Sequence, residues 1–472
     1  MSLRALHTAR SGLLAQQRAL DVTSGNVANV NTPGYARRRI TITPIVPERG
    51  HLGTGVRADR VVSFRSQYLD AAVRDFTSRH ARSQTDALVF QQLSAVLGEP
   101  QSETGLNALL GRFFDALQQL VLRPEDIALR ELFLQRAEDI AAAFRRLGEQ
   151  LQRQRTELVQ HLQQQVEHLN PLLERLAELN RQRALAPEGS EQALALADEQ
   201  ARVLEELSRL VPVTVAQDSR GMLTVSLAGH VVVEGEVALR VQLQTRRAGL
   251  SDEQHTVLQL VEASGKVLAE LSPTGGELGS LLWHVNVTLD PEEQSGEFSL
   301  PRELNRFVAR WVERVNGILA QGYGLDDGAG PPPGRRLFEG ETMQTLRLSG
   351  DVVGNPRALP LSEAPAQPGN STIAQRLLAL AEDRSFADGM TPQGFSAAVL
   401  SRLGELHARS SSQEEWLQAS LQQLEAQRQA LSGVNLDEEA TNLIRYQKAY
   451  EASARVLSVA ASLLDTLIRI GT

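Results

Sequence analysis

Few residues of this chain have the types and spacing that catalysis or metal binding requires. His161 and His168 are seven residues apart, and no carboxylate completes the HExxH pattern of a zinc protease. Asp326-Asp327-Gly328 lacks the spaced acidic ligands and the final glutamate of an EF-hand loop. P-loop, GxGxxG and GxSxG motifs are absent as well. The sequence therefore predicts no enzyme, no cofactor and no metal site, and we interpret both histidines as solvated helix residues.

Composition excludes several further classes. The 472 residues carry a net charge of −9, which disfavours a nucleic-acid partner or an anionic membrane surface. No apolar run approaches the ~20 residues of a membrane span, so membrane insertion is not expected. Cysteine is absent, which rules out disulfides and thiolate metal sites. The first ten residues lack the apolar region and cleavage site of a secretory signal, so we expect no cleaved signal peptide.

The elements that organise the chain are long apolar rows at its two ends. Residues 435–470 and 3–30 each repeat an apolar side chain every seven residues, which predicts two helices with narrow coiled-coil-like seams. Two terminal helices with matching seams are natural partners for each other and for copies of themselves. The predicted seam consists of Leu6, Leu13, Leu20, Val27, Leu436, Leu443, Tyr450, Leu457 and Leu464.

Turn and cap signals frame these two helices. Pro33-Gly34 has the composition of a type II turn, in which proline presets φ and glycine accepts a positive φ, so it should stop the first helix. Asn435 is predicted to cap the last helix, with Glu438 completing a capping box. Residues 36–65 are predicted to form short strands with a turn at 53–56. The triplet Arg37-Arg38-Arg39 at the first strand is interpreted as solvated or paired charge rather than a specific site.

Both ends of the chain resemble one protein family. Residues 5–35 and 432–456 are similar to the terminal signatures of the bacterial flagellar axial proteins, which comprise rod, hook and hook–filament junction proteins. Gly25 departs from the usual asparagine of that family and should loosen the end of the first helix. The N-terminal match includes the turn and signature residues Asn29, Asn31, Thr32, Pro33, Gly34 and Tyr35.

The middle of the chain favours one branch of that family. Apolar periodicity predicts helices between 106 and 210, one opening at Pro124 and kinked at Pro171, whereas 211–272 alternates with period two and predicts a compact β-domain. The helical block resembles the hook-associated (hook–filament junction) members, because hook and rod proteins carry β-rich domains there. The predicted fold is mainly α with an inserted β-domain, long terminal coiled-coil-like helices, a central helical bundle and nested, discontinuous domains.

Four domains are expected, and their boundaries follow these pattern changes. Residues 1–35 and 433–472 would form a terminal helical assembly domain, and 36–97 a connector of strands and helix. A helical bundle would combine 98–210 with 298–432, and 211–297 would form a β-rich outer domain.

The resemblance implies a structural subunit of the extracellular flagellum. Its partners would be copies of itself in a ring, the hook subunit below, a second junction protein above, the flagellar export apparatus and a cytosolic export chaperone on the C-terminal region. Two alternatives stay open: a sibling hook or distal rod protein, and, from another class, a cytosolic coiled-coil scaffold.

Overall fold

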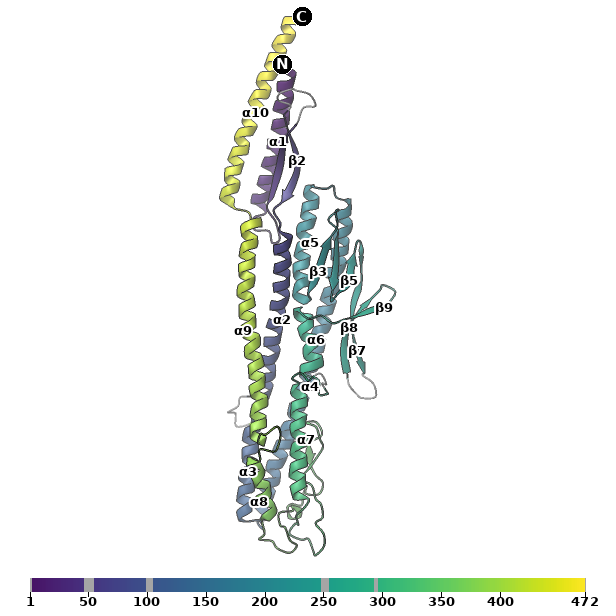
Figure 1. The fold of residues 1–472 in the computed structure, drawn as a ribbon, viewed down its shortest axis with the longest axis vertical. Helices are drawn as coiled ribbons and strands as arrows, with labels where there is room; N and C mark the ends of the chain where they lie inside the picture. The colour runs from purple at the N-terminus through teal and green to yellow at the C-terminus, as the bar shows by residue number, and fades with distance from the viewer. Residues whose placement is uncertain (1, 46–54, 99–104, 248–253, 293–295, 472) are drawn as a thin grey trace.

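The computed structural model of the chain is elongated, with the two chain ends side by side at one end of the molecule (Figure 1). It describes residues 2–45, 55–98, 105–247, 254–292 and 296–471. Residues 53 and 54 of the predicted turn at 53–56, and residues 99 and 100 next to the predicted domain boundary at 98, therefore lie outside the described residues. The fold is mainly α with inserted small sheets, as the sequence predicts. No helix in the described ranges is long and apolar enough to cross a membrane.

The first and last helices form one unit with a small hairpin. Helix α1 packs along helix α10, and the antiparallel strands β1 and β2 lie against α1. We call these four elements the terminal unit and the remaining elements the body. The members of the terminal unit are α1 (Ser2–Ala28), β1 (Arg38–Pro44), β2 (Val56–Ser63) and α10 (Leu436–Gly471).

A long antiparallel helix pair leads from the terminal unit into the body. Helices α2 (Gln67–Leu97) and α9 (Pro392–Ser432) pack against each other (Figure 1). Local caps explain where both begin. The Ser66 hydroxyl accepts from the Leu69 amide at 3.4 Å, and the Thr391 hydroxyl accepts from the Gly394 amide at 3.0 Å. Pro392 then stands in the first helical turn, where its missing N–H costs nothing.

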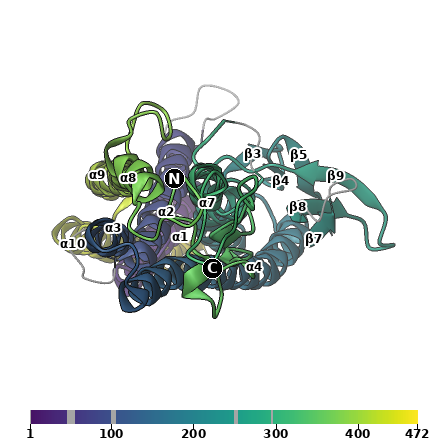
Figure 2. The ribbon, with the colours of Figure 1, turned by 90° about the horizontal axis from the view of Figure 1, so that it is seen from below.

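The far end of the body is a helical bundle around an aromatic core. Trp311 is fully buried, and its ring centroid lies 5.2 Å from Phe113 and 6.1 Å from Phe307. This bundle is seen end-on in Figure 2. The elements that complete it are α3 (Leu106–Leu122), the start of α4 (Ile127–Leu185), α7 (Leu300–Leu319), β10 (Phe338–Glu339), β11 (Arg347–Leu348), η2 (Pro356–Ala358), α8 (Thr372–Ala379) and η3 (Leu380–Glu382).

Helix α4 corrects one sequence prediction. It begins at Ile127 rather than at Pro124, because the Asp126 carboxylate caps it by accepting from the Ala128 amide at 3.0 Å. It also continues through Pro171 as one helix of 59 residues. Proline inside a helix costs about 3 kcal/mol, which the fully or largely buried Leu169 and Leu173 on either side offset through packing.

The predicted β-domain contains two sheets. A four-stranded sheet and a three-stranded sheet, all antiparallel, lie on one flank of the body (Figure 1), and they share a single apolar core with the helices. The helix at the end of the predicted helical block precedes these sheets, and one short helix with a π-helical turn falls within residues 211–297, which the sequence predicts to be β-rich. The elements are α5 (Glu191–Leu210), β3 (Val213–Gln217), β4 (Leu223–Leu227), β5 (His230–Glu234), β6 (Val237–Ala238), β7 (Arg240–Arg247), β8 (Gln254–Val261), β9 (Val267–Leu271), α6 (Gly276–Trp283) and the π-helical turn η1 (His284–Thr288).

Asparagine side chains fix these sheets to the helices. Asn170 on α4 bonds both the N–H and the C=O of Val241, at 2.8 and 2.9 Å. Asn180 lies ten residues further along α4 and is fully buried. Its side chain likewise bonds both the N–H and the C=O of Leu223. Asparagine suits this task because its amide presents a donor and an acceptor side by side. The sheets are thereby held in fixed register on α4.

Candidate functional site

The contact between α1 and α10 is built from small side chains. Ala15 and Ala19 on α1 are at most 1 % exposed, and Ala460 on α10 is 4 % exposed. A Cβ placed on Gly12 would lie 3.2 Å from the hydroxyl oxygen of Ser453. Small residues let the two helix backbones approach closely, so this interface is narrow and tight rather than leucine-filled.

The predicted seam follows the same contact but lies at its margins. Leu6, Leu13, Leu20, Val27, Leu443, Tyr450, Leu457 and Leu464 are all partly buried. Leu436 is 51 % exposed, because it is the first residue of α10 and precedes the overlap with α1. A two-helix contact covers only one side of each helix, which explains why the seam leucines keep one flank open to solvent.

A tight turn ends α1 and sends the chain back toward β1. Asn29 closes the helix, since its side-chain amide donates to the Gly25 carbonyl at 2.9 Å. Gly34 has φ of 78°, and the Tyr35 amide donates to the Thr32 carbonyl at 3.2 Å, which is the geometry of a type II turn with Pro33 at its second position. Asn31, Thr32 and Pro33 are exposed on the outside of this turn.

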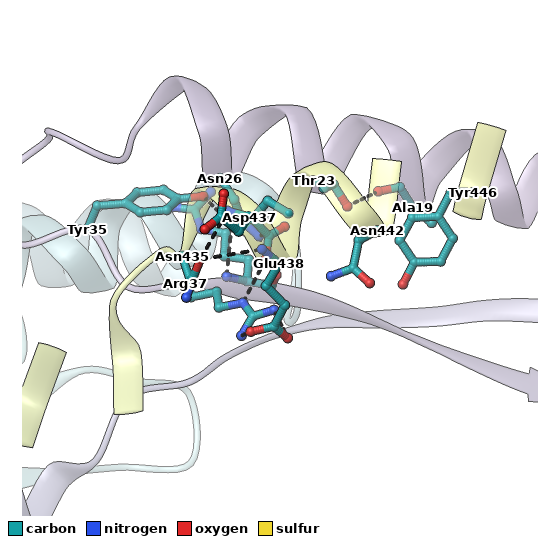
Figure 3. Close-up of polar contacts among 12 residues, drawn as sticks. Ala19, Thr23, Asn26, Tyr35, Arg37, Asn435, Asp437, Glu438, Asn442 and Tyr446 are labelled. Carbon is teal, nitrogen blue, oxygen red and sulfur yellow. Dashed lines mark hydrogen bonds and ion pairs between the residues drawn. The ribbon is translucent and has the colours of Figure 1, made fainter. Parts of the chain in front are cut away.

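Asn26 is the hub of the polar contacts beneath this turn (Figure 3). Only 1 % of it is exposed. Its amide oxygen accepts from the Arg38 N–H at 3.0 Å and from the Tyr35 hydroxyl at 2.9 Å. Its amide nitrogen donates to the Arg38 carbonyl at 2.8 Å and to Glu439 Oε2 at 3.1 Å. One side chain of α1 therefore holds the turn, strand β1 and helix α10 together.

Arg37 closes the same network from the other side (Figure 3). Its Nε donates to Glu439 Oε1 at 2.8 Å, and its two terminal nitrogens donate to the Glu438 carboxylate at 2.6 and 2.9 Å. The hydrogen bond from Arg37 lowers the pKa of Glu438 below its usual value. Burial raises the pKa of the Tyr35 phenol. We call Asn26, Tyr35, Arg37, Glu438 and Glu439 the polar clamp.

The start of α10 departs from the predicted capping box. Asn435 caps the helix, because its side-chain oxygen accepts from the Asp437 amide at 3.0 Å. Glu438, however, does not reach back to complete the box, since both of its carboxylate oxygens accept from Arg37. A bidentate pair with a guanidinium is stronger than a bond to one neutral amide, so the longer-range partner prevails.

Sequence reasoning placed the turn, the cap and Glu438 in one region but missed the centre of the clamp. Arg37 is a paired charge close to the start of a strand, as predicted. Its partners Glu438 and Glu439, however, lie 401 and 402 residues further along the chain. Glu439 stood among three consecutive acidic residues that are equally suited to an exposed first turn. Only the matching terminal signatures, which include Asn26, could have pointed to this contact.

The clamp offers a stability prediction with an internal control. Glu439 is 2 % exposed and Glu438 is 55 % exposed, yet both bind Arg37. Replacing Glu439 by alanine strands the buried Asn26 amide and should weaken the α1–α10 contact by about 3 kcal/mol. Replacing Glu438 should cost less than about 1 kcal/mol, as for exposed ion pairs. Hydrogen exchange of α1 amides should then be about 100-fold faster in Glu439→Ala, and equal rates in the two variants would contradict the clamp.

The residues considered for metal chemistry lie elsewhere and serve other roles. His161 Nε2 is 3.1 Å from Glu277, His168 Nε2 is 3.2 Å from Glu206, and both imidazoles are about half exposed. Asp327 binds Arg335 through both carboxylate oxygens at 2.6 Å. Within the described part of the chain, no three His, Asp or Glu side chains gather where they could hold a metal ion.

Three family models match the chain. The one described as the helical domain of the flagellar hook-associated protein FlgK covers residues 90–338, more than half of the chain. The C-terminal model of the flagellar basal-body rod FlgEFG proteins covers residues 425–470, and the flagella basal-body rod protein model covers residues 6–35. The two rod models cover α10 and α1, the helices that the polar clamp joins.

Individual relatives agree with these models along nearly the whole length. The flagellar hook-associated protein 1 of Bacillus subtilis strain 168 is 27 % identical, over 98 % of this chain and 97 % of its own. The protein of the same name from Salmonella typhimurium is 24 % identical, over 98 % and 99 %. The solved structure of the flagellar hook junction protein FlgK from Burkholderia pseudomallei has the same fold, with a TM-score of 0.65 at 14 % identity, covering 77 % of this chain and all of that one. This chain belongs to the family of the flagellar hook-associated protein FlgK.

Proposed function

We propose that this chain is a structural subunit of the junction between the flagellar hook and filament, and that it assembles through its terminal unit. The observation that carries the proposal is the joining of the two chain ends. The rod-type signatures of both termini form one helix pair, which the polar clamp locks at the end of an elongated body. A unit of this kind is suited to packing against equivalent units of neighbouring subunits.

Helix α10 supplies the apolar surface that such packing needs. Val456, Val459 and Leu463 of α10 are 51, 58 and 56 % exposed. Burying side chains of this size contributes about 1.5–3 kcal/mol each. Copies of the chain in a ring would cover this row, and the half-open seam from Leu6 to Leu464 would be covered with it.

The proposed place in the junction implies specific partner proteins. We place the hook subunit below the ring and a second junction protein above it. Before assembly, the subunit would pass through the flagellar export apparatus, with a cytosolic chaperone on its C-terminal region, and it would act outside the cell. The exposed row on α10 supports the chaperone assignment, since an apolar surface of this kind favours a covering partner before assembly.

The sibling hook or distal rod role is the second candidate, and the helical block argues against it. The FlgK helical-domain model matches the middle of the chain, whereas the rod-type models match only its ends. We also propose the division into four domains, with 1–35 and 433–472 as the assembly domain. We propose that the polar clamp and the seam only hold the helices together, and we propose no catalytic role for them.

Complementation tests the assignment. In a strain that lacks its own junction protein but builds hooks, expression of this chain should restore filaments, because the ring supplies the surface on which they start. Without it, filament subunits should accumulate in the medium while hooks stay bare. Electron microscopy of cells and quantification of secreted filament protein give the two readouts. Restoration of missing hooks, rather than of missing filaments, would instead assign the chain to the hook or rod.

A further inference from the structure

Charge is divided unequally between the terminal unit and the body. Residues 1–66 contain ten arginines and only three acidic residues. Together with residues 433–472 they carry six more basic than acidic side chains, whereas residues 67–432 carry fifteen more acidic than basic ones. Two parts of opposite net charge attract each other at their boundary.

One carboxylate of the body serves two arginines of the terminal side. Asp198 on α5 accepts from Arg38 at 2.8 Å and from Arg65 at 3.0 Å. The nearest other acid to Arg38 is Glu191, at 3.9 Å and with 87 % of its side chain exposed. Arg65 also donates to the Gly34 carbonyl of the turn at 2.6 Å. Asp198 is thus the shared counter-charge that draws β1 and the turn onto α5.

Apolar packing does not reinforce this boundary. The contiguous apolar core runs from Val89 to Leu403 and includes no residue of α1, β1, β2 or α10. Instead, a cavity of about 740 Å³ lies between the parts, lined by the turn at 32–35, by Arg65 and Glu205, and by the last residues of α9. The Nε atoms of Arg38 and Arg65 are buried without a hydrogen-bond partner. Arg65 has a second carboxylate in Asp70 on α2, at 3.2 Å, whereas Asp198 is the one carboxylate within hydrogen-bond distance of Arg38 among the described residues.

The covalent connections across the boundary are short and irregular. The chain crosses once between the end of β2 at Ser63 and the start of α2 at Gln67, and once between the end of α9 at Ser432 and the start of α10 at Leu436. Figure 1 shows these crossings where the terminal unit meets α2, α5 and α9. A few residues outside regular structure can absorb the φ/ψ changes of a hinge.

We infer that Asp198 is an electrostatic latch that sets the angle between the terminal unit and the body of the free subunit. With Asp198 ionised, Arg38 and Arg65 hold the turn on α5 and the hinge is closed. Without that charge, Arg38 loses its close carboxylate partner, Arg65 keeps only Asp70, and the terminal unit swings on its two crossings. The inference does not depend on where the subunit assembles.

Distance measurement between spin labels tests the latch, and the absence of cysteine makes the labelling unambiguous. Labels on Ser24→Cys and Gln192→Cys, both exposed, span the boundary between α1 and α5. Asp198→Asn should shift the distribution of label-to-label distances or increase its width roughly twofold, because a second orientation of the terminal unit becomes populated. The matched control is Glu199→Gln, which removes an equal charge from the next residue. Glu199 pairs only with Arg202 and Arg175 in the described structure, so this variant should keep the wild-type distribution.

Salt gives a second test that requires no change at the latch. Raising the ionic strength from 0.15 to 1 M shortens the Debye length from about 8 to about 3 Å. The wild-type distribution should then broaden toward that of Asp198→Asn, which should itself respond little. Labels on Gln164→Cys and Gln192→Cys, both within the body, should stay narrow throughout. A wild-type distribution that is insensitive to salt, or one already as broad as that of Asp198→Asn, would overturn the latch, even if Asp198→Asn failed to fold.

Discussion

Replacing Val459 and Leu463 together by aspartate should leave the free subunit folded and abolish filament growth on the hook. Both side chains are more than half exposed, so in the monomer two added carboxylates stay in water and cost little stability. In a ring of subunits the same positions would be covered. Each buried, unpaired carboxylate then costs several kcal/mol, enough to prevent assembly. Melting of the purified protein and counts of filaments per cell measure the two effects.

The control adds the same charge to the neighbouring face of α10. Ser458 and Ser462 are exposed polar residues one turn apart, and their double replacement by aspartate should permit more filaments than the Val459/Leu463 variant. Normal filament numbers in the Val459/Leu463 variant would show that the exposed apolar side chains of α10 do not form an interface. Our assembly proposal would then need another surface.

The second large effect is expected from the seam itself. Replacing Leu443 and Leu457 by aspartate should separate α10 from α1, because both side chains are partly buried at this contact. Unpaired carboxylates in that contact should cost several kcal/mol in total. Hydrogen exchange should accelerate strongly in residues 2–28 and 436–471 but remain slow in the body. The reason is that the contiguous apolar core contains no residue of the terminal unit.

A conservative pair of changes separates charge from packing. Leu443→Met with Leu457→Met keeps the volume and apolar character, so it should cost less than about 1.5 kcal/mol per site and retain protection in both helices. If the aspartate pair also exposed the body to rapid exchange, α10 would be an integral member of the main core. The division into terminal unit and body would then be wrong.

The parts of this fold that the sequence predicted well are those specified locally. The predicted connector at 36–97 contains a helix, α2, whose limits are marked locally by the Ser66 cap and by Gly98 after its last residue. The turn after α1 follows from Pro33 and Gly34 alone. The type and approximate limits of α7 and α10 follow equally from apolar periodicity, which adjacent residues carry.

The parts that it missed depend on distant partners. Glu438 indicated a capping box, but Arg37 is the stronger partner. The alternation of 211–272 indicated one β-domain, because it carries no information on which strands pair, and two sheets result. Asp198 lies within an ordinary charged helix, so nothing local distinguishes it from Glu199.

The joining of Asn26 to Glu439 also constrains the order in which the molecule can fold. These two residues are 413 positions apart, so helix α1 can meet the nearby strands β1 and β2 early but cannot meet α10 until almost the whole chain is available. Closing so long a loop is slow and entropically unfavourable, whereas the helices of the body meet neighbours that are much closer in sequence. The body should therefore form first and bring the ends together, and the first residues to be synthesised should be among the last to reach their native contacts.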